Sequence, residues 1–176
     1  MTEHIYGICS SYFNPLHDGH LKYIEESYLY IHEEAGYEED DCSLFLIINN
    51  DEQVKLKNSI PFLNQEIRQD IVAGLTFVDD VFLSIDQDES VAKTIEQIIK
   101  VYAIQKELGE QVYFFNSGDQ KEPNPQEDEI CRQYGIEQVF LDLPKINSSS
   151  EILDKVGQEW HERYMRSMTP MQDSVG

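Results

Sequence analysis

The stretch IYGICSSYFNPLHDGHLKYIEESYLYIHEE, residues 5–34, decides the fold. Its first five residues are an apolar run that predicts a β-strand, and the two serines that follow end the run. From Gly19 to about Glu34, apolar side chains recur every three or four residues, which predicts an amphipathic helix. The recurring residues are Leu21, Ile24, Tyr28 and Ile31. A strand, a polar loop and a helix in this order form one βα unit.

The same alternation continues through the rest of the chain. Further strands are predicted over 44–48, 81–85, 111–115 and 136–141, and helices over 64–77, 90–108, 125–134 and 149–164. Five such units, with connections long enough for crossover helices, predict an α/β fold. The expected form is Rossmann-like, a five-stranded parallel sheet with helices on both faces. We expect one domain over residues 1–164 and a flexible C-terminal tail over residues 165–176.

Composition excludes several classes of partner. Among 176 residues, 34 are acidic and 13 basic, so the formal charge is −21. Such a chain repels nucleic acid and anionic membranes at long range, and an apolar content of 40% argues against disorder. Three unpatterned cysteines indicate a reducing compartment, and neither a leader segment nor a membrane-spanning run is visible. We therefore expect a soluble cytoplasmic protein with neither a nucleic-acid nor a membrane partner.

Two histidines stand in the loop after the first predicted strand, where open parallel sheets bind their ligands. His17 and His20 are three residues apart at the start of a helix, so both imidazoles project to one side. Together with the free N–H groups of the helix, they would donate hydrogen bonds to a phosphate, which Gly19 would allow close to the backbone. A purely structural pair is an equal alternative. A metal pair is a third, although no further His or Cys lies nearby.

Cations follow the second predicted strand. Lys55 and Lys57 would face the same way in an extended loop and could reach a triphosphate together, or they are solvated surface lysines. Arg68 would reach the phosphates or would pair with Glu66 or Asp70. Local cations matter here because the molecule as a whole repels an anionic substrate.

Two further loops carry polar residues. Gly118-Asp119 follows the fourth predicted strand, and Asp119 would bind a ribose or base or would only shape the turn. Ser148, Ser149 and Ser150 open the last predicted helix, where hydroxyl groups bind phosphate or simply cap the helix. Lys145 would add a cation close by.

These motifs together resemble the nucleotidylyltransferase superfamily with the HxGH signature. FNPLHDGH (13–20) is similar to that signature, and residues 49–57 resemble the lysine-bearing loop of the cytidylyltransferase-like branch. Residues 66–81 look like its Arg-bearing helix and following strand, Gly118-Asp119 like its GD turn, and residues 148–152 like its last motif. The motifs stand in family order across about residues 5–153. The nearest kinds of enzyme are glycerol-3-phosphate cytidylyltransferases and heptose-phosphate adenylyltransferases.

The resemblance implies transfer of CMP or AMP from CTP or ATP to a phosphorylated sugar or polyol, with release of pyrophosphate. It implies catalytic roles for His17, His20 and Lys57, and phosphate contacts for Arg68 and Lys145. Mg²⁺ would be held mainly by the triphosphate, with no protein ligand assigned. The implied nucleotide-binding residues are Ser11, Tyr12, Phe13, Asn14, Gly19, Lys55, Gly118, Asp119, Ser148, Ser149 and Ser150.

The sequence departs from the family pattern in places, which leaves other functions open. Asn14-Pro15 replaces the Asp-Leu of glycerol-3-phosphate cytidylyltransferases and resembles mononucleotide adenylyltransferases, so a nicotinate or nicotinamide mononucleotide adenylyltransferase is one alternative. A catalytically silent nucleotide-binding subunit is another. The linker over residues 33–41 is long and acidic, which we interpret as solvation. A homodimer covered by tyrosine-rich helices is an open alternative to ordinary core packing for Tyr23, Tyr28, Tyr30 and Tyr102.

Overall fold

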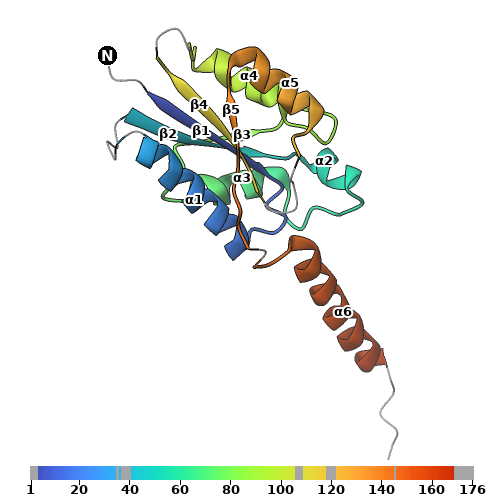
Figure 1. Cartoon of the computed structure of the whole chain (residues 1–176). Coiled ribbons are helices and arrows are strands. Elements are labelled where there is room, and N and C mark those ends of the chain that lie inside the picture. Colours follow the sequence, from blue (N-terminus) through green and yellow to red (C-terminus); the bar gives the residue numbers. More distant parts are fainter. Residues whose placement is uncertain are drawn as a thin grey trace, which may run out of the picture.

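A parallel sheet of five strands lies at the centre of the protein, as the sequence predicts. The structure is a computed structural model that describes residues 4–34, 36, 41–105, 109–117, 122–144 and 146–168. All strand pairings are parallel, in the order β3-β2-β1-β4-β5 (Figure 1). The strands are β1 (Ile5–Ser11), β2 (Cys42–Ile48), β3 (Asp80–Leu83), β4 (Gln111–Asn116) and β5 (Glu137–Phe140).

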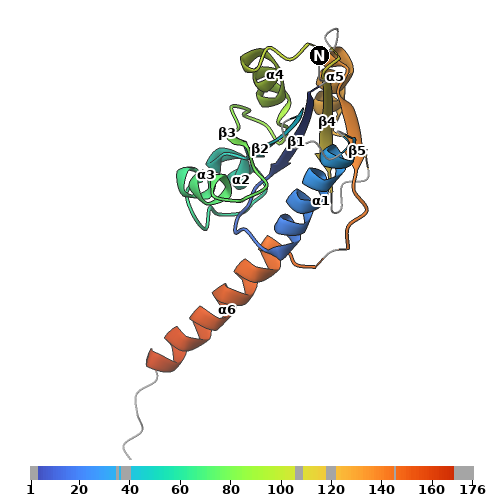
Figure 2. The same cartoon turned by 90° about the vertical axis from the view of Figure 1, so that its left-hand side faces the viewer.

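Helices cover both faces of the sheet, which confirms the predicted α/β architecture (Figure 2). Helices α1 (Asp18–Glu34) and α3 (Gln65–Ala73) pack on one face, and α4 (Ala92–Val101) and α5 (Pro125–Tyr134) pack on the other. Two further helices, α2 (Asp51–Leu56) and α6 (Ser149–Met168), complete the described elements. Among the described residues, no helix combines the length and the apolar character needed to cross a bilayer.

Alternation along the buried strands builds the two halves of the core. On β1, Ile5 and Cys9 pack toward α1 and α3, whereas Tyr6 and Ile8 pack toward α4 and α5. Gly7 lies between them because a Cβ there would come within 2.8 Å of the Leu44 side chain. The central strand is therefore covered on both faces, and a ligand can reach it only near its carboxyl end.

Four helices differ from the predicted ones. Helix α3 ends at Ala73, with Gly74 at its C-cap, instead of continuing to about Phe77. Residues 51–56 form α2 instead of an extended loop, because Asn50 and Gln53 make a reciprocal capping box. Helix α4 begins at Ala92 and ends at Val101, and Ser90 bonds to Asp88 instead of capping it. Helix α6 continues four residues beyond the predicted end, so only residues 169–176 of the expected tail lie outside the described residues.

The strand order reverses between β1 and β4, and this reversal positions the site. Chain connections leave β1 toward β2 on one side and return to β4 on the other. The crossover helices therefore diverge, and a crevice opens where the carboxyl ends of β1 and β4 lie side by side. Ser11 ends β1 and Asn116 ends β4.

Candidate active site

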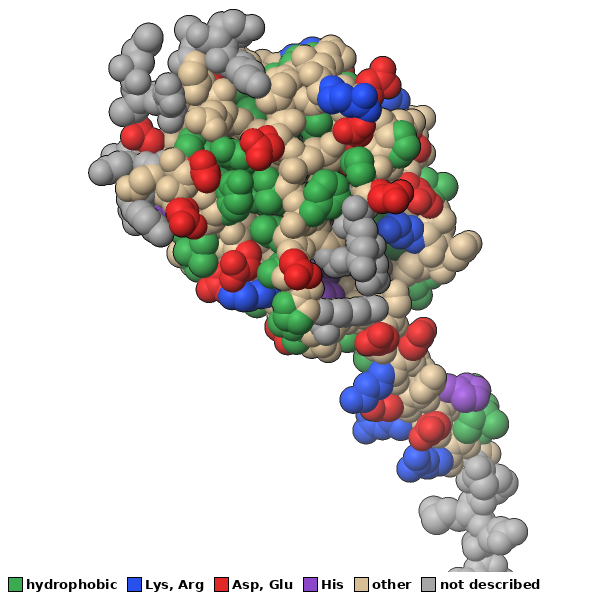
Figure 3. Space-filling model, viewed as in Figure 1, with side chains coloured by type: hydrophobic (Ala, Val, Ile, Leu, Met, Phe, Trp, Pro, Cys, Tyr) green, Lys and Arg blue, Asp and Glu red, His purple; other side chains and the backbone are tan. Residues whose placement is uncertain are grey.

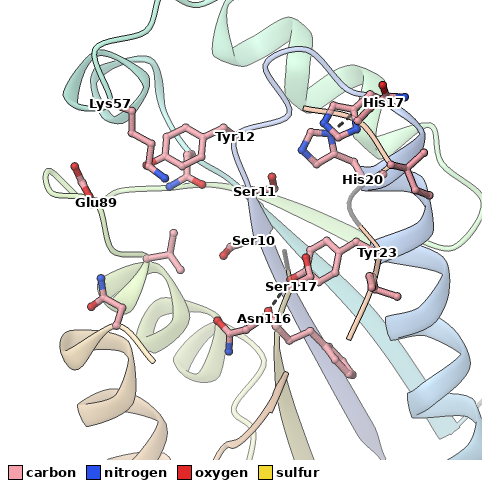
Figure 4. A pocket seen from close by; sticks show the side chains of 18 of the residues that line it. Ser10, Ser11, Tyr12, His17, His20, Tyr23, Lys57, Glu89, Asn116 and Ser117 are labelled. Atoms are coloured by element: carbon pink, nitrogen blue, oxygen red, sulfur yellow. Dashed lines mark hydrogen bonds between the residues drawn. The ribbon is translucent and has the colours of Figure 1, made fainter. Parts of the chain in front are cut away.

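A cavity of about 520 Å³ occupies this crevice (Figure 4). Its wall comes from the ends of β1 and β4, the first turns of α1 and α5, and the segment that leads into α6. Of the residues predicted for the site, the lining contains Ser11, Tyr12, His17, Gly19, His20 and Lys57. Side chains from positions 46 residues apart, such as Ser11 and Lys57, thus meet at one edge of the sheet.

The two histidines form a stacked pair in the wall of the cavity. Their ring centroids are 3.8 Å apart and their planes differ by 26°. The backbone N–H of His17 donates to Nδ1 of His20 at 3.3 Å. This bond fixes Nδ1 of His20 as an acceptor, so the proton of the neutral ring is on Nε2 and is available to a ligand.

Burial lowers the pKa of both imidazoles. Desolvation, with a contribution from the neighbouring His17, lowers the pKa of His20 from 6.5 to about 3. Desolvation also lowers the pKa of His17, although the Asp18 carboxylate opposes the shift. Both rings are therefore neutral hydrogen-bond donors at pH 7 in the free protein.

Glycine and a strained phenylalanine support the pair. A Cβ at Gly19 would lie 3.0 Å from the His17 ring, so this glycine makes room for the imidazole. The Phe13 backbone has φ of 46°, a conformation that a non-glycine residue holds only when its surroundings impose it. The Phe13 ring is buried, 5.0 Å from the ring of His20. The Phe13 ring therefore packs against His20 and does not line the cavity.

Two buried polar atoms in the cavity wall lack a hydrogen-bond partner. They are Nδ1 of His17 and the hydroxyl of Tyr12, and they are the only such side-chain atoms among the described residues. An unpaired buried donor or acceptor is costly, typically about 1–3 kcal/mol. Their coincidence in one cavity indicates a surface built to meet a polar ligand.

Lys57 brings a positive charge to the opposite side of the cavity. Its Nζ lies 4.6 Å from the centroid of the Tyr12 ring, a cation–π contact. In Figure 4, Lys57 and Tyr12 lie on one side of Ser11 and the two histidines on the other. Burial and the charges of Glu89 and Glu127 raise the pKa of Tyr12 to about 12, so its hydroxyl stays protonated.

Lys55 does not accompany Lys57. The expectation that both would face the same way was wrong, because residues 51–56 are helical and alternate residues of a helix point in different directions. Lys55 is exposed and its Nζ binds the Glu52 carboxylate at 2.6 Å on the same helix. The structure thus brings only one of the two predicted lysines to the cavity.

Arg68 is a structural residue in this protein, and neither predicted partner holds it. Its guanidinium is buried and donates to the backbone carbonyls of Tyr12 and Asn49 and to the Asp51 carboxylate, the last at 2.7 Å. A buried charge needs such satisfaction. Arg68 therefore holds the loops after β1 and β2 together instead of contacting phosphates.

Asn14 likewise supports the loop from outside the cavity. It is buried, its amide donates to the Ile60 carbonyl at 2.8 Å, and its side-chain oxygen accepts from the Phe62 N–H at 2.6 Å. Both ends of the side chain are therefore occupied by residues 60–62. The structure gives Asn14 a role in loop geometry.

The start of α6 lies against the histidine-bearing loop. The Ser149 hydroxyl donates to the Pro15 carbonyl at 3.0 Å, and the Asn147 amide donates to Asp18 at 2.6 Å. Ile146 and Asn147 line the cavity, whereas the cavity wall does not include Ser148, Ser149 and Ser150. Gly118, Asp119 and Lys145 lie outside the described residues, as do residues 35 and 37–40 of the acidic linker.

The sequence reasoning missed several polar residues of the wall. Asn116 ends β4 and Ser117 follows it, so the position of the strand end could have identified them. Glu89 and Glu127 bring two carboxylates, and the Glu127 carboxylate accepts from the Val91 N–H at 3.0 Å. Within the described part of the chain, no three His, Cys, Asp or Glu side chains are grouped so that they could hold a metal ion.

Comparisons with known proteins agree with this fold. The family model described as cytidylyltransferase-like matches residues 8–155, so the chain belongs to the cytidylyltransferase-like family. It is a nucleotidyltransferase by that membership. A crystal structure of the lipopolysaccharide core biosynthesis protein from Thermoplasma volcanium GSS1 shares the fold, with a TM-score of 0.56 and 18% identity over 80% of this chain and 98% of that one. No curated protein sequence matches the chain.

Replacement of Arg68 tests its structural role. We expect Arg68→Met to lower the free energy of unfolding by about 3 kcal/mol, because three carbonyls, those of Tyr12, Asn49 and Leu63, and the Asp51 carboxylate lose their partner. Arg132→Met is the matched control, since that exposed arginine pairs with Asp128 on the surface and its loss should cost less than about 1 kcal/mol. Urea unfolding of both variants measures the difference, and equal losses would contradict the assignment.

The depressed pKa of His20 makes stability depend on pH. Below pH 6.5 the unfolded chain binds a proton at this residue, whereas the folded chain does not until about pH 3. The free energy of unfolding should therefore fall by roughly 1–2 kcal/mol between pH 7 and pH 5 on account of His20. His20→Gln should flatten this part of the profile, and His161→Gln, on the exposed surface of α6, should not. An unchanged slope in His20→Gln would refute the buried neutral imidazole.

Proposed function

We propose that this protein transfers CMP or AMP from CTP or ATP to a phosphorylated sugar or polyol and releases pyrophosphate. The observation that carries the proposal is the stacked pair of neutral histidines in the crevice, with Nδ1 of His17 buried and without a hydrogen-bond partner. Family membership supports the class of reaction.

In the proposed step, an oxygen of the acceptor's phosphate attacks the α-phosphorus of the nucleoside triphosphate. A new P–O bond forms there, and the bond from the α-phosphorus to the bridging oxygen breaks. Pyrophosphate leaves with the electron pair of that bond. Since a phosphate acceptor is already ionised near neutral pH, the step needs no strong general base, and positioning and charge stabilisation supply most of the rate.

His17 and His20 are the proposed donors to the α-phosphate. Their geometry supports this role, because Nδ1 of His20 is occupied by the backbone and the remaining N–H is left for a ligand. Because both rings are neutral, no charge on them has to be desolvated when the substrate binds. The charge that develops on the phosphate oxygens during the reaction then strengthens their hydrogen bonds. An incoming triphosphate would also raise the pKa of both imidazoles.

Lys57 is the proposed cation for the triphosphate. It is the only Lys or Arg among the described residues that line the cavity, and Tyr12 holds its ammonium group near the rim. The first turns of α1 and α5 also reach the wall, where Gly19 and Asn124 lie, and helix N-termini attract phosphate. Mg²⁺ would arrive bound to the triphosphate as part of the substrate.

Neutral polar groups support a hydroxyl-bearing acceptor. Ser10, Asn116, Ser117 and Asn124 line the cavity, and hydroxyl and amide side chains of this kind hydrogen-bond to sugar or polyol hydroxyls. The two carboxylates, Glu89 and Glu127, can accept hydrogen bonds from the same groups. A second anionic group on the acceptor would instead be repelled by them.

The thiols support the prediction of a cytoplasmic protein. Cys9, Cys42 and Cys131 are all buried, and none of them forms a disulfide. Burial raises the pKa of the Cys9 and Cys131 thiols to about 12, which keeps them protonated and unreactive. Such thiols persist readily in a reducing compartment.

A screen of pyrophosphate release tests the proposed function. The full chain with Mg²⁺ is assayed with each of four nucleoside triphosphates against sugar phosphates, polyol phosphates and nicotinamide mononucleotide. We expect release that requires both CTP or ATP and a sugar or polyol phosphate. Release with ATP and nicotinamide mononucleotide alone would assign the alternative adenylyltransferase. Nucleotide binding without release across the whole panel would indicate a silent binding subunit.

Matched lysine variants test the proposed site. Lys57→Met should lower kcat/KM for the triphosphate about 10- to 100-fold, because a charge-assisted contact is lost. Lys55→Met removes the same charge two residues away, outside the cavity, and should change kcat/KM less than about twofold. His17→Ala or His20→Ala should reduce turnover about 10²- to 10³-fold without loss of the fold by circular dichroism. Equal effects of the two lysine variants would contradict the assigned geometry.

A further inference from the structure

Helix α6 stands apart from the rest of the described structure. It extends away from the body in both views (Figures 1 and 2). None of its 20 residues is buried. Most helical stability in proteins comes from packing of an apolar face, and an isolated helix of this length is marginal in water. The helix therefore lacks, within this chain's described residues, the packing that a stable helix normally has.

An apolar stripe runs along this helix. Leu153, Val156, Trp160 and Tyr164 recur at spacings of three or four residues, so they share one face. Trp160 is 67% exposed and Tyr164 57% exposed. Large aromatic side chains at this level of exposure are typical of interface anchors.

Two exposed apolar side chains stand on a loop that hydrogen bonds connect to the base of the helix. Ser149 bonds to Pro15, and the adjacent Asn14 holds Ile60 and Phe62 through two hydrogen bonds. Ile60 is 74% exposed and Phe62 is 52% exposed. We call the α6 stripe together with these two loop residues the α6 surface.

Charge distinguishes α6 from the body. Four carboxylates and three cations give the helix a formal charge of −1, whereas the chain as a whole has −21. Figure 3 shows blue and red side chains mixed along the projecting helix. A second copy of this acidic chain is therefore repelled less at α6 than at the strongly acidic body.

The edge of the stripe is complementary to itself. At 3.6 residues per turn, Glu159 and Arg163 lie on the same edge, one turn apart. When two copies pair antiparallel, this edge faces its own reversed copy, and each Glu159 meets the other chain's Arg163. No atom lies within 4 Å of a Cβ built on Gly157, so a second helix can approach the backbone there.

We propose that the α6 surface is a homodimer interface in which two α6 helices pair antiparallel. A 20-residue helix is about 30 Å long, so this orientation places the two acidic bodies at opposite ends of the pair. That separation is several times the Debye length of about 8 Å at physiological salt. The helix dipoles also oppose each other favourably in this arrangement. The last turns of the partner helix then lie beside the first turns of α6.

The molar mass of the full chain tests the interface. Sedimentation equilibrium should give twice 20.5 kDa for the wild type, with a dimer that dissociates on dilution. Trp160→Glu should raise the dissociation constant about 30-fold or more, as loss of an aromatic anchor does. Gln158→Glu adds the same charge on the opposite side of the helix and should leave the constant within about threefold. A monomeric wild type, or a Trp160→Glu variant as dimeric as the wild type, would overturn the proposal.

Reversal of one edge tests the orientation. Arg163→Glu should weaken the dimer, since two carboxylates then face two carboxylates across the interface. The double change Glu159→Arg with Arg163→Glu, made in the same chain, should restore the mass of the dimer. Failure of the double variant to dimerise better than Arg163→Glu would exclude the antiparallel pairing.

Trp160 is the single tryptophan of the chain, so its fluorescence reports on this surface directly. Its emission should shift to shorter wavelength as protein concentration rises, and the Tyr164→Glu variant should lack the shift. The same titration is made with vesicles of neutral and of anionic lipid at low protein concentration. A blue shift that appears only with vesicles would assign the α6 surface to a membrane and overturn the dimer.

Discussion

A single buried guanidinium ties together the loops on which the site depends. Arg68 comes from α3, yet its hydrogen bonds end on the loop after β1, on the end of β2 and on the first residue of α2. Tyr12 is held by this contact, and Tyr12 in turn positions Lys57 through its ring. The position of Lys57 at the cavity therefore depends on Arg68, which does not itself line the cavity.

The electrostatics of the cavity differ from those of a simple basic pocket. One lysine and two glutamates line the described wall, and the two histidines are neutral at pH 7. Under the proposed function, attraction of a polyanion into a molecule of charge −21 would come from oriented N–H groups, from one ammonium and from Mg²⁺ bound to the triphosphate. Neutral donors of this kind form hydrogen bonds that become stronger as negative charge develops on the phosphate oxygens in the transition state. Interactions that are stronger in the transition state than in the bound substrate are the ones that accelerate a reaction.

Sequence reasoning predicted what depends on local pattern and strand order. The five strands, the histidine pair and the place of Lys57 follow from apolar runs and from the rule that ligands bind at strand ends. The separation of Lys55 from Lys57 depends on helix α2, which begins at the capping box formed by the side chains of Asn50 and Gln53. The role of Arg68 depends on carbonyl partners up to 56 residues away in sequence, and the glutamates of the wall carry no motif of their own. Such long-range contacts leave no periodic signal in a single sequence.

The claim that the histidine pair receives the nucleotide is tested most directly by imidazole resonances in nitrogen-15 NMR. The chain has five histidines, of which only His17 and His20 line the cavity. On titration with CTP or ATP and Mg²⁺, the ring nitrogens of these two should shift toward the values of hydrogen-bonded or protonated imidazole, while His4, His32 and His161 stay unchanged. Saturable nucleotide binding that leaves the resonances of His17 and His20 in place would contradict the account.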